Sequence, residues 1–245
     1  MPVINTINGK YRYKAQALYQ GIKRIDKKIA FENLCLFKQL CEKNHFHFFL
    51  AYGTLLGAIR ENDFIEHDED IDLGALYDDK EVLLSMLFEL RENGFEVIRW
   101  DDRGLMSIIR KGEYIDIYMF KPLTRQLHAV CGAPFPKEFI DNQTIISFRG
   151  VDFYAPAEFE KNLEFFYGKN WKTPVVDNDY NVSYVKILFY KITCWIKQIY
   201  PKFLKKRYFA KQELAAFNRY YSKGKLDNYL EKDEVNRIIC TNSKK

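Results

Sequence analysis

Hydrophobic residues near the start of the chain recur at the spacing of an amphipathic helix. Ile22, Ile25 and Ile29 follow one another at intervals of three and four residues, and similar spacing continues through the next turns. In an α-helix such residues share one face, which packs against the protein interior. The pattern therefore predicts one long helix over residues 15–43, preceded by a loose leader over residues 1–8.

Farther along the chain, short apolar runs and two-residue alternation replace the helical spacing. Alternation of this kind is typical of a strand with one buried face. The runs predict strands over residues 46–51, 70–73, 95–99, 105–110 and 114–120, and a hairpin of residues 145–148 and 151–154. Helical spacing returns in residues 55–60, 79–93 and 157–167. Together these segments predict a mixed α/β (α+β) domain built around antiparallel strands.

Beyond residue 174 the predicted strands give way to helical segments separated by Pro201 and Gly224. Both residue types interrupt helices, proline because it lacks an N–H and glycine because its backbone is too flexible. We therefore expect two regions. Residues 1–174 form the α/β domain with its N-terminal helix, and residues 175–245 form a helical C-terminal extension.

Charge is distributed unevenly between these regions. The whole chain of 245 residues carries a formal net charge of +5, yet residues 182–212 contain eight Lys or Arg and no Asp or Glu. The remainder is therefore mildly acidic, which excludes a uniformly basic nucleic-acid-binding surface. The content of 47% hydrophobic and 29% charged residues is that of a globular protein and excludes a disordered chain.

The basic segment has two interpretations. Lys186, Lys191 and Lys197 interrupt its apolar residues, which excludes a membrane-spanning helix. An amphipathic helix with Ile187 and Trp195 on its apolar face could lie on an anionic membrane, or that face could pack on the α/β domain with the lysines in water. The chain opens without a secretory signal and its five cysteines form no CxxC pair. We therefore expect a cytoplasmic protein with reduced thiols, and peripheral contact with the inner membrane face through residues 182–212 under the first interpretation.

Two carboxylates stand two residues apart on a predicted strand. Period two places the side chains of Asp70 and Asp72 on the same face, while Ile71 and Leu73 point into the core. Two such carboxylates repel each other unless a cation lies between them, and Mg²⁺ prefers oxygen ligands of this kind. Asp116 is a third acid in an otherwise apolar and aromatic strand, where a charge needs a partner. The three acids predict a Mg²⁺ or Mn²⁺ site that faces a phosphate.

A glycine turn precedes the acidic cluster. Gly53 and Thr54 connect a predicted strand to a short helix, where backbone N–H groups and a hydroxyl can bind phosphate at the positive end of the helix dipole. Arg60, on the same short helix, either contacts phosphate or forms a structural ion pair. Two alternative interpretations of the acids in residues 68–72 remain, an acidic surface loop and a calcium-binding loop. The second lacks the central glycine and the glutamate at the twelfth position that such loops need.

The order of these features resembles the nucleotidyltransferase superfamily. The longer string from Gly53 to Leu73 resembles the LicD family of phosphocholine transferases, which includes the fukutin-related domains. The shared pattern is Gly-Thr-Leu-Leu-Gly-x-x-Arg, then Phe-Ile and a cluster ending in Asp-x-Asp-Ile-Asp-Leu. Residues 167–174, Tyr-Gly-Lys-Asn-Trp-Lys-Thr-Pro, resemble the family's closing motif. Departures stand at His67, where the family often has an aromatic residue, and at Glu69, where Asp is usual.

This resemblance implies a Mg²⁺-dependent transferase. A phospho-substituent (phosphocholine, phosphoethanolamine or a polyol phosphate) would pass from a CDP-activated donor to a hydroxyl of a surface glycan such as lipopolysaccharide or capsule, releasing CMP. Asp70, Asp72 and Asp116 would hold the metal, and Asp116 would help to deprotonate the acceptor hydroxyl. Gly53 and Thr54 would contact donor phosphate, and Asp68 would support the metal.

Further features of the function stay open in the sequence. Arg110 and Lys121 are additional basic candidates for phosphate contact. One alternative keeps the fold but transfers a nucleoside monophosphate from a nucleoside triphosphate to a protein or small molecule, releasing pyrophosphate. Another is a family member that has lost catalysis and binds a glycan or a partner protein. The intact set of Asp70, Asp72 and Asp116 argues against the last.

Overall fold

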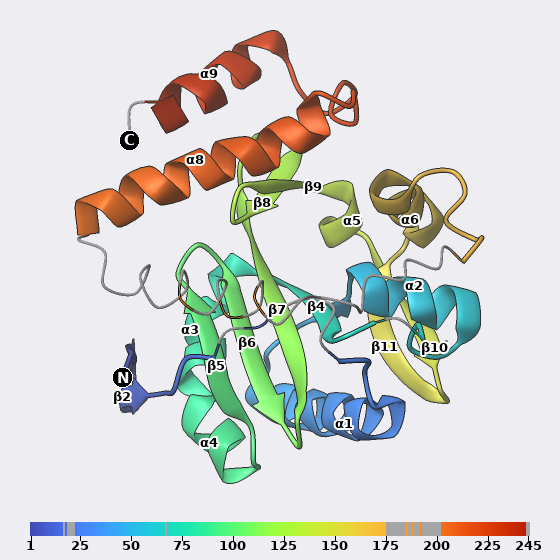
Figure 1. Cartoon of the computed structure of the whole chain (residues 1–245). Helices are drawn as coiled ribbons and strands as arrows, with labels where there is room; N and C mark the ends of the chain where they lie inside the picture. The colour runs from blue at the N-terminus through green and yellow to red at the C-terminus, as the bar shows by residue number, and fades with distance from the viewer. Residues whose placement is uncertain are drawn as a thin grey trace.

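The centre of the fold is a seven-stranded mixed sheet. The computed structural model describes residues 1–16, 18, 23–66, 68–174, 185, 188, 192 and 202–243. The main path of the sheet runs in the order β3 (Phe49–Leu50), β4 (Ile71–Leu76), β7 (Glu113–Pro122), β6 (Leu105–Arg110) and β5 (Glu96–Asp101) (Figure 1). The far end of β7 also pairs with β8 (Leu127–Val130), which pairs with β9 (Ala133–Pro136).

One strand pair departs from the predicted antiparallel arrangement. β4 and β7 are parallel, whereas the other pairs in this sheet are antiparallel. Parallel neighbours need a long crossover connection, and here residues 77–112 supply it. The sheet is therefore mixed, as the α/β fold class requires, and its one parallel pair lies in the middle.

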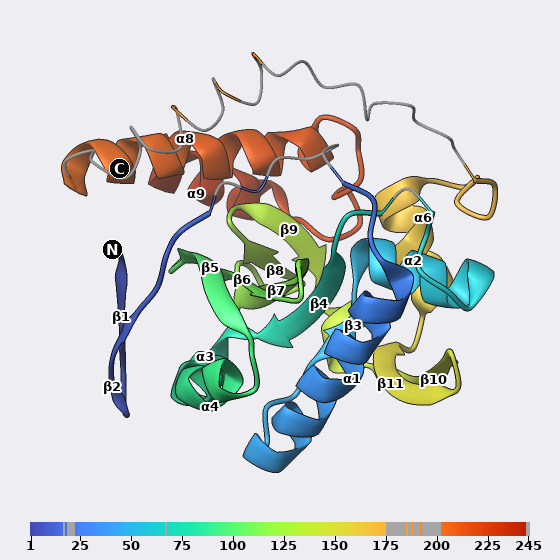
Figure 2. The same ribbon diagram turned by 60° about the horizontal axis from the view of Figure 1, so that its bottom comes forward.

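Helices on one face of the sheet enclose the main core. They are α1 (Lys27–Asn44), α3 (Lys80–Ser85) and α4 (Leu87–Glu92), with η1 (Tyr77–Asp79) leading into α3. The largest cluster of buried side chains joins them to the sheet through fully buried residues such as Leu34, Phe37, Leu73, Ile108 and Ile117. Figure 2 shows these helices on the opposite side of the sheet from the C-terminal helices.

The N-terminal region differs from its prediction in two ways. The helix α1 begins at Lys27, because the side chain of Asp26 caps it by accepting hydrogen bonds from the amides of Lys28 and Ile29. Residues 15, 16, 18 and 23–26 of the predicted helix are not helical, and residues 17 and 19–22 lie outside the described residues. The expected loose leader instead contains an antiparallel hairpin of β1 (Val3–Thr6) and β2 (Gly9–Arg12).

Most other predicted elements are present with shifted ends. The predicted helix of residues 79–93 is divided into α3 and α4 at Met86, and the short helix α2 (Tyr52–Glu61) begins before Gly53. The hairpin forms from β10 (Gln143–Phe148) and β11 (Val151–Pro156), and α6 (Phe159–Tyr167) follows it. The short strands β8 and β9 and the helix α5 (Glu138–Asp141) were not predicted.

The C-terminal helices pack on the end of the sheet. α8 (Lys202–Tyr221) begins after Pro201 and ends before Gly224, as predicted, and α9 (Lys232–Ser243) follows. Phe217, Leu226 and Ile238 form a small core with Leu127 of β8. At Gly132, whose φ is +85°, an added Cβ would lie 2.2 Å from the Cα of Glu213, so the β8–β9 turn and α8 touch backbone to backbone. No helix among the described residues is long and apolar enough to cross a membrane.

Candidate active site

A row of polar side chains crosses the middle of the sheet. In the strand register, Asp72 of β4 lies beside Asp116 of β7, Asp116 beside Ser107 of β6, and Ser107 beside Arg99 of β5. Because side chains alternate between faces along each strand, paired residues share a face. The four residues therefore lie side by side on the face opposite the main core, and the structure brings together the predicted Asp72 and Asp116.

The Asp116 carboxylate is fully partnered. Its Oδ2 accepts hydrogen bonds from the Arg99 guanidinium and, at 3.5 Å, from the Tyr118 hydroxyl, and its Oδ1 accepts one from the Ser107 hydroxyl. Asp116 is buried, with 3% of its surface exposed, and Arg99 forms an ion pair with it. A buried carboxylate needs such partners, since an isolated charge there would be very costly. Asp116 was predicted from the sequence as a site residue, but its ion-pair partner Arg99 was not.

The helix α2 is tied to β4 through the predicted Gly-Thr turn. The Gly53 amide donates to Oδ2 of Asp72 over 3.0 Å, and the Asp72 amide donates to the Thr54 hydroxyl over 2.8 Å. Thr54 is fully buried. Both groups that were predicted to bind phosphate thus bind the strand of the acids, and their contact with a donor phosphate stays a prediction.

Burial and mutual repulsion shift the cluster of acids toward its protonated forms. Burial, and after it the charges of Asp72 and Asp116, raises the pKa of Asp70 well above its ordinary value. Burial, with the charges of Asp68 and Asp116, does the same for the pKa of Asp72. The pKa of Asp68 rises to about 7, chiefly through burial and then through Asp70. The protein alone therefore holds three carboxyl groups whose charge a nearby cation would stabilise.

Oxygen donors that suit a hard divalent ion are present, although a complete cage is not. Among the buried side-chain atoms of the described residues, Oδ2 of Asp68 lacks a hydrogen-bond partner. It faces Gly53 closely enough that an added Cβ there would lie 2.6 Å from it. Within the same described residues, no group of three or more His, Cys, Asp or Glu side chains is already arranged as a metal site. The donor chemistry fits Mg²⁺ or Mn²⁺, and the predicted set of Asp70, Asp72 and Asp116 stays a prediction.

Tyrosine side chains surround the acids. Tyr114 and Tyr118 flank Asp116 at two-residue spacing on β7, and their pKa values are raised, first by burial and then by the neighbouring carboxylates. Tyr52, at the start of α2, packs edge-on against Tyr118 with ring centroids 4.9 Å apart. Its φ of +41° is the left-handed conformation, which is strained for a bulky residue. Tyr118 donates a hydrogen bond to Asp116, and Tyr114 donates one to Asp70.

The tyrosines around the acids were not predicted from the sequence. The signal for Tyr114 and Tyr118 was available, because period two on a strand places them on the face of Asp116. Tyr52 carried no such signal, since its position depends on the left-handed turn into α2. Partial burial and then the charges of Asp72 and Asp68 raise the pKa of Tyr167 of the closing motif, although the residue is 43% exposed.

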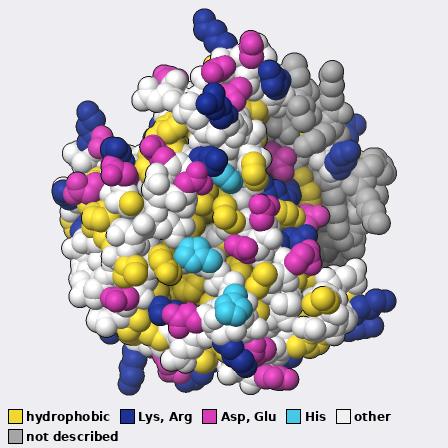
Figure 3. Space-filling view, turned by 180° about the vertical axis from the view of Figure 1, so that it is seen from behind, with side chains coloured by type: hydrophobic (Ala, Val, Ile, Leu, Met, Phe, Trp, Pro, Cys, Tyr) yellow, Lys and Arg dark blue, Asp and Glu magenta, His cyan; other side chains and the backbone are white. Residues whose placement is uncertain are grey.

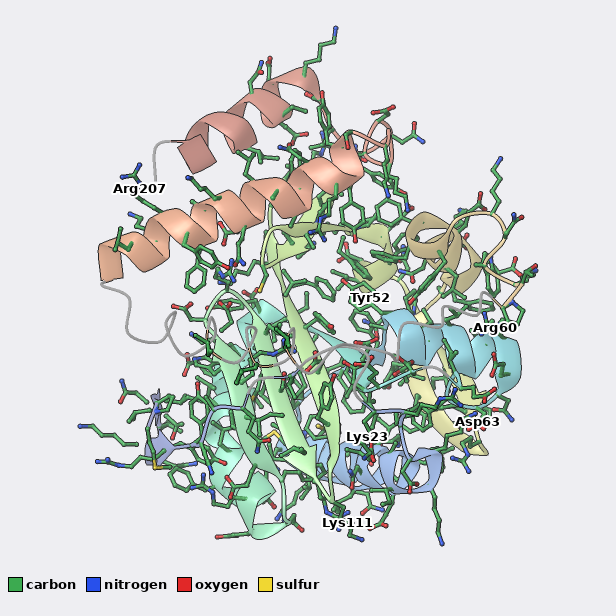
Figure 4. The ribbon with its side chains drawn as sticks, viewed as in Figure 1. Lys23, Tyr52, Arg60, Asp63, Lys111 and Arg207 are labelled. Atoms are coloured by element: carbon green, nitrogen blue, oxygen red, sulfur yellow. The ribbon has the colours of Figure 1, made fainter. Side chains whose placement is uncertain are left out.

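The predicted basic candidates lie in different places. Arg60 is at the far end of α2 from Tyr52 (Figure 4), where it pairs with Glu61 and its Nη1 lies 3.4 Å from the carbonyl of Trp171. Arg60 therefore forms the ion pair that was one of its two predicted roles, and contact with phosphate stays a prediction. Arg110 binds Glu32 and Asn33 over 2.9 Å each, at the edge where β6 meets α1. Lys121 donates to the carbonyl of Asp102 over 2.9 Å, at the end of β7.

The acid site lies within a segment that matches a known family. Residues 45–158 match the model of the LicD/FKTN/FKRP nucleotidyltransferase domain. This segment is a LicD-family domain. It contains the Gly-Thr turn, the acidic strand β4 and Asp116 of β7. The resemblance inferred from the motifs is thereby confirmed, and the mixed α/β fold is that of a nucleotidyltransferase domain.

Two curated relatives of this chain come from Rickettsia and are named as uncharacterized proteins. An uncharacterized protein of Rickettsia typhi is 24% identical over 130 residues, which cover 51% of this chain and 41% of the relative. An uncharacterized protein of Rickettsia prowazekii is 32% identical over 91 residues, which cover 37% of this chain and 29% of the relative. The chain thus spans less than half the length of these relatives.

Solved structures similar to this chain include an antibiotic adenylyltransferase and an antibiotic-resistance factor. The lincosamide antibiotic adenylyltransferase LnuA, bound to lincomycin, aligns with a TM-score of 0.44 and 13% identity, covering 64% of this chain and 94% of that one. The antibiotic-resistance factor ANT(2'')-Ia aligns with a TM-score of 0.44 and 14% identity, covering 83% of this chain and all of that one.

Proposed function

We propose that this LicD-family chain transfers a phospho-substituent from a CDP-activated donor to a hydroxyl group of a surface glycan. The observation that carries the proposal is the parallel register of β4 and β7, which places the Asp72 and Asp116 carboxylates side by side on a buried polar face. In the reaction, the acceptor oxygen forms a bond to the phosphorus that bears the substituent. The bond from that phosphorus to CMP breaks, CMP leaves with the electron pair, and the acceptor proton passes to a carboxylate or to solvent.

The residues of the chain would mainly position the reacting groups and balance their charge, as phosphoryl transfer requires. Asp116 is the proposed acceptor of the hydroxyl proton, and its bonds with Arg99 and Ser107 fix the orientation of its carboxylate. The Tyr118 hydroxyl, a protonated donor beside Asp116, is placed to orient an oxygen of the transferred group. The bonds from Gly53 and Thr54 to Asp72 hold β4 and the start of α2 in a fixed relation.

Asp70 and Asp72 would hold a Mg²⁺ or Mn²⁺ ion, with Asp116 completing the set and Asp68 supporting it. The repulsion that raises the pKa values of Asp70 and Asp72, together with the unpartnered Oδ2 of Asp68, supports this assignment. When bound, such an ion neutralises charge on the diphosphate of the donor. The intact acids favour an enzyme over a family member that only binds a glycan or a partner.

The test is a ligand panel on the full chain. Thermal unfolding is measured with CDP-choline, CDP-ethanolamine, CDP-glycerol, CDP-ribitol, CTP and ATP, each with and without Mg²⁺. A ligand at about 100 times its Kd stabilises the folded state by about 2.7 kcal/mol, which for a chain of this size raises Tm by several degrees. We expect at least one CDP compound to do so with Mg²⁺, and CMP release in the presence of a glycan acceptor.

The control for this panel is Asp72→Asn, which removes one charge from the site and keeps the side-chain size. Metal-dependent stabilisation by the CDP compound should disappear in this variant. Tight binding of ATP without a response to any CDP compound would contradict the proposal and favour transfer of a nucleoside monophosphate. Equal stabilisation of the wild type and Asp72→Asn would contradict the assignment of the site.

We also propose that residues 182–212 make peripheral contact with an anionic membrane, at the cytoplasmic face expected from the sequence. Val185, Leu188 and Ile192, spaced by three and four residues, are each at least 45% exposed. Ile187, Trp195 and Ile199 lie outside the described residues. On α8, Lys206, Arg207 and Lys211 are exposed. Exposed apolar residues and exposed cations within one segment support contact with a lipid surface, to which each cation contributes about 1 kcal/mol.

Vesicle co-sedimentation tests this contact. The chain should pellet with anionic vesicles at low salt and be released as salt rises, because the Debye length falls from about 10 Å at 0.1 M to about 3 Å at 1 M. Leu188→Gln should weaken the interaction, and Ile145→Gln, an exposed apolar residue of β10, is the matched control. A chain that stays in the supernatant with anionic vesicles at low salt would contradict the membrane contact.

A further inference from the structure

A cavity of about 310 Å³ lies between the end of the sheet and the C-terminal helices, apart from the row of acids. Its walls come from the turn after β5, the end of β7, the β8–β9 hairpin, α8 and α9, and none of the predicted catalytic residues lines it. Figure 1 shows α8 crossing above this end of the sheet, with α9 beyond it. The cavity is at the lower end of the size range for small-molecule sites.

One guanidinium nitrogen of Arg103, in the turn after β5, has no hydrogen-bond partner in the described part of the chain. Its Nε and Nη2 donate to the carboxylate of Asp101, with the closest contact at 2.6 Å, and its guanidinium stacks on the Phe209 ring, 4.0 Å from the ring centroid. Its Nη1 is among the buried side-chain atoms of the described residues that lack a hydrogen-bond partner, although it forms an ion pair with Oε1 of Glu213 at 3.8 Å. A buried donor of this kind is costly unless a ligand or water accepts from it.

Two more cations reach the same cavity from other segments. Lys121, at the end of β7, donates to the Asp102 carbonyl over 2.9 Å and keeps further N–H donors. Arg237 of α9 is exposed, and within the described part of the chain it forms neither a hydrogen bond nor an ion pair. The lining has three cations and the carboxylate of Glu213, and Asp101, outside the lining, is already paired with Arg103, so the cations exceed the carboxylates by one. Such an excess of positive charge around a cavity favours an anion.

Figure 3 provides a contrast to this arrangement. On the back of the molecule, acidic and basic side chains are interspersed and do not gather by sign. The cations of the cavity converge from three separate segments on one hollow. The remaining walls are largely apolar, with Leu123, Ala129, Phe217 and Ile238 among them.

We propose that this cavity binds a small soluble phosphomonoester, with its phosphate between Arg103, Lys121 and Arg237 and its carbon skeleton against the apolar wall. A phosphomonoester carries a charge of about −1.5 to −2 at neutral pH and three acceptor oxygens, which match three cationic donors from different directions. Because the donors belong to β7, the turn after β5 and α9, a bound phosphate joins the C-terminal helices to the catalytic sheet. The site is separate from the acids, and the proposal does not depend on the reaction proposed for them.

The test is isothermal titration calorimetry of the full chain with glycerol 3-phosphate and with inorganic phosphate at constant ionic strength. We expect saturable binding of glycerol 3-phosphate, and Arg237→Gln and Lys121→Gln should each weaken it by about tenfold or more, as the loss of a charged hydrogen bond does. The matched control is Arg219→Gln on α8, an exposed arginine outside the cavity, which should change the Kd by no more than about twofold.

A further variant and a lipid measurement distinguish binding in this cavity from binding at the acids or to a membrane. Asp72→Asn should bind glycerol 3-phosphate as the wild type does, and a loss of binding there would place the ligand at the acids and overturn the proposal. The absence of saturable heat up to millimolar ligand, or equal weakening by Arg219→Gln, would overturn it as well. If vesicles with phosphatidic acid are bound in an Arg237-dependent manner while glycerol 3-phosphate is not, a lipid headgroup replaces the soluble ester.

Discussion

The two faces of the strands β4 and β7 differ as sharply as any two regions of the molecule. On one face, Ile71, Leu73, Ile115 and Ile117 are fully buried in the main core. On the other face of the same strands, Asp72 and Asp116 are almost as deeply buried, with 8% and 3% of their surfaces exposed. The apolar face gains free energy by leaving water, whereas the acidic face loses it and needs cations. The same backbone therefore supports stability on one side and chemistry on the other.

The largest effect is expected from removing a charge on the acidic face. Asp70→Asn or Asp72→Asn should lower turnover by about 1,000-fold or more, because a transferred phosphoryl group depends on the charges around it. Stability in urea without metal should stay equal or rise slightly, since one of the repelling, buried carboxylates is gone. CMP release and urea unfolding measure the two effects. Asp152→Asn, which changes an exposed acid on β11, is the control. Near-wild-type turnover in either site variant would refute the metal assignment.

A truncation on the apolar face should lower the free energy of unfolding, in contrast to the substitutions on the acidic face, which lower turnover. Ile117→Ala removes a fully buried side chain and leaves a cavity, which costs about 2–5 kcal/mol of unfolding free energy. Urea unfolding gives the value, and Ile145→Ala on exposed β10 should change it by no more than about 0.5 kcal/mol. Equal destabilisation by Ile117→Ala and Asp72→Asn would contradict the inference that the apolar face stabilises the fold and the acidic face does not.

Removal of Arg99 tests whether its ion pair with Asp116 stabilises the acidic face of the sheet. Arg99→Gln leaves a buried carboxylate without its positive partner and should cost about 1–2 kcal/mol, below the value for a fully buried pair because the Arg99 side chain is 35% exposed. Asp116→Asn in the same chain should recover part of this loss, because the neutral amide needs no cation. A double-mutant cycle in urea measures the coupling, and additive effects would show that the pair does not act as one.

The smallest effect is expected at the outer edge of the sheet, where Glu32 accepts from Lys111 over 2.7 Å and from Arg110 over 2.9 Å. Hydrogen bonds from these two cations lower the pKa of Glu32 from 4.5 to about 2. Since the folded-state pKa is depressed, the stabilisation is complete above pH 4.5 and is lost as pH falls toward 2. Glu32→Gln should reduce the pH dependence of the urea midpoint in this window, and Glu231→Gln, an exposed acid, should leave it unchanged.

The sequence allowed prediction of the apolar pattern and of the acids, because both depend on local alternation. Asp72 and Asp116 were recognisable from period two and from a charge in an apolar strand, whereas Asp70, predicted on the same strand, precedes β4, which begins at Ile71; the metal-binding role of all three stays a prediction. The role of Gly53 and Thr54 in tying α2 to β4 was not, since their partner lies 18–19 residues away. Arg99 was missed because its link to Asp116 depends on the register of three strands, which alternation within one strand cannot give.

The boundaries of the elements were less predictable than their existence. Helical spacing extended the first helix back to residue 15, but the cap at Asp26 starts it at Lys27. The strands β8 and β9 have only four residues each, and β9 contains Pro134 and Pro136, which are unfavourable in a strand and make its sequence resemble a loop. Their pairing is stabilised by the C-terminal helices packed against them, and such tertiary contacts leave no local signature.

The parallel pairing of β4 with β7 has a consequence for the order of folding. Asp72 and Asp116 meet only when these strands pair, and the intervening chain, which holds η1, α3, α4, β5 and β6, must first close a loop. Contacts between residues so far apart in sequence form slowly, because the entropy of loop closure is lost before the contact contributes. The β5–β6 and β6–β7 hairpins are local and can form earlier. The repulsion between the acids therefore enters at a late step, which places the slowest stage of folding at the same strands that carry the chemistry.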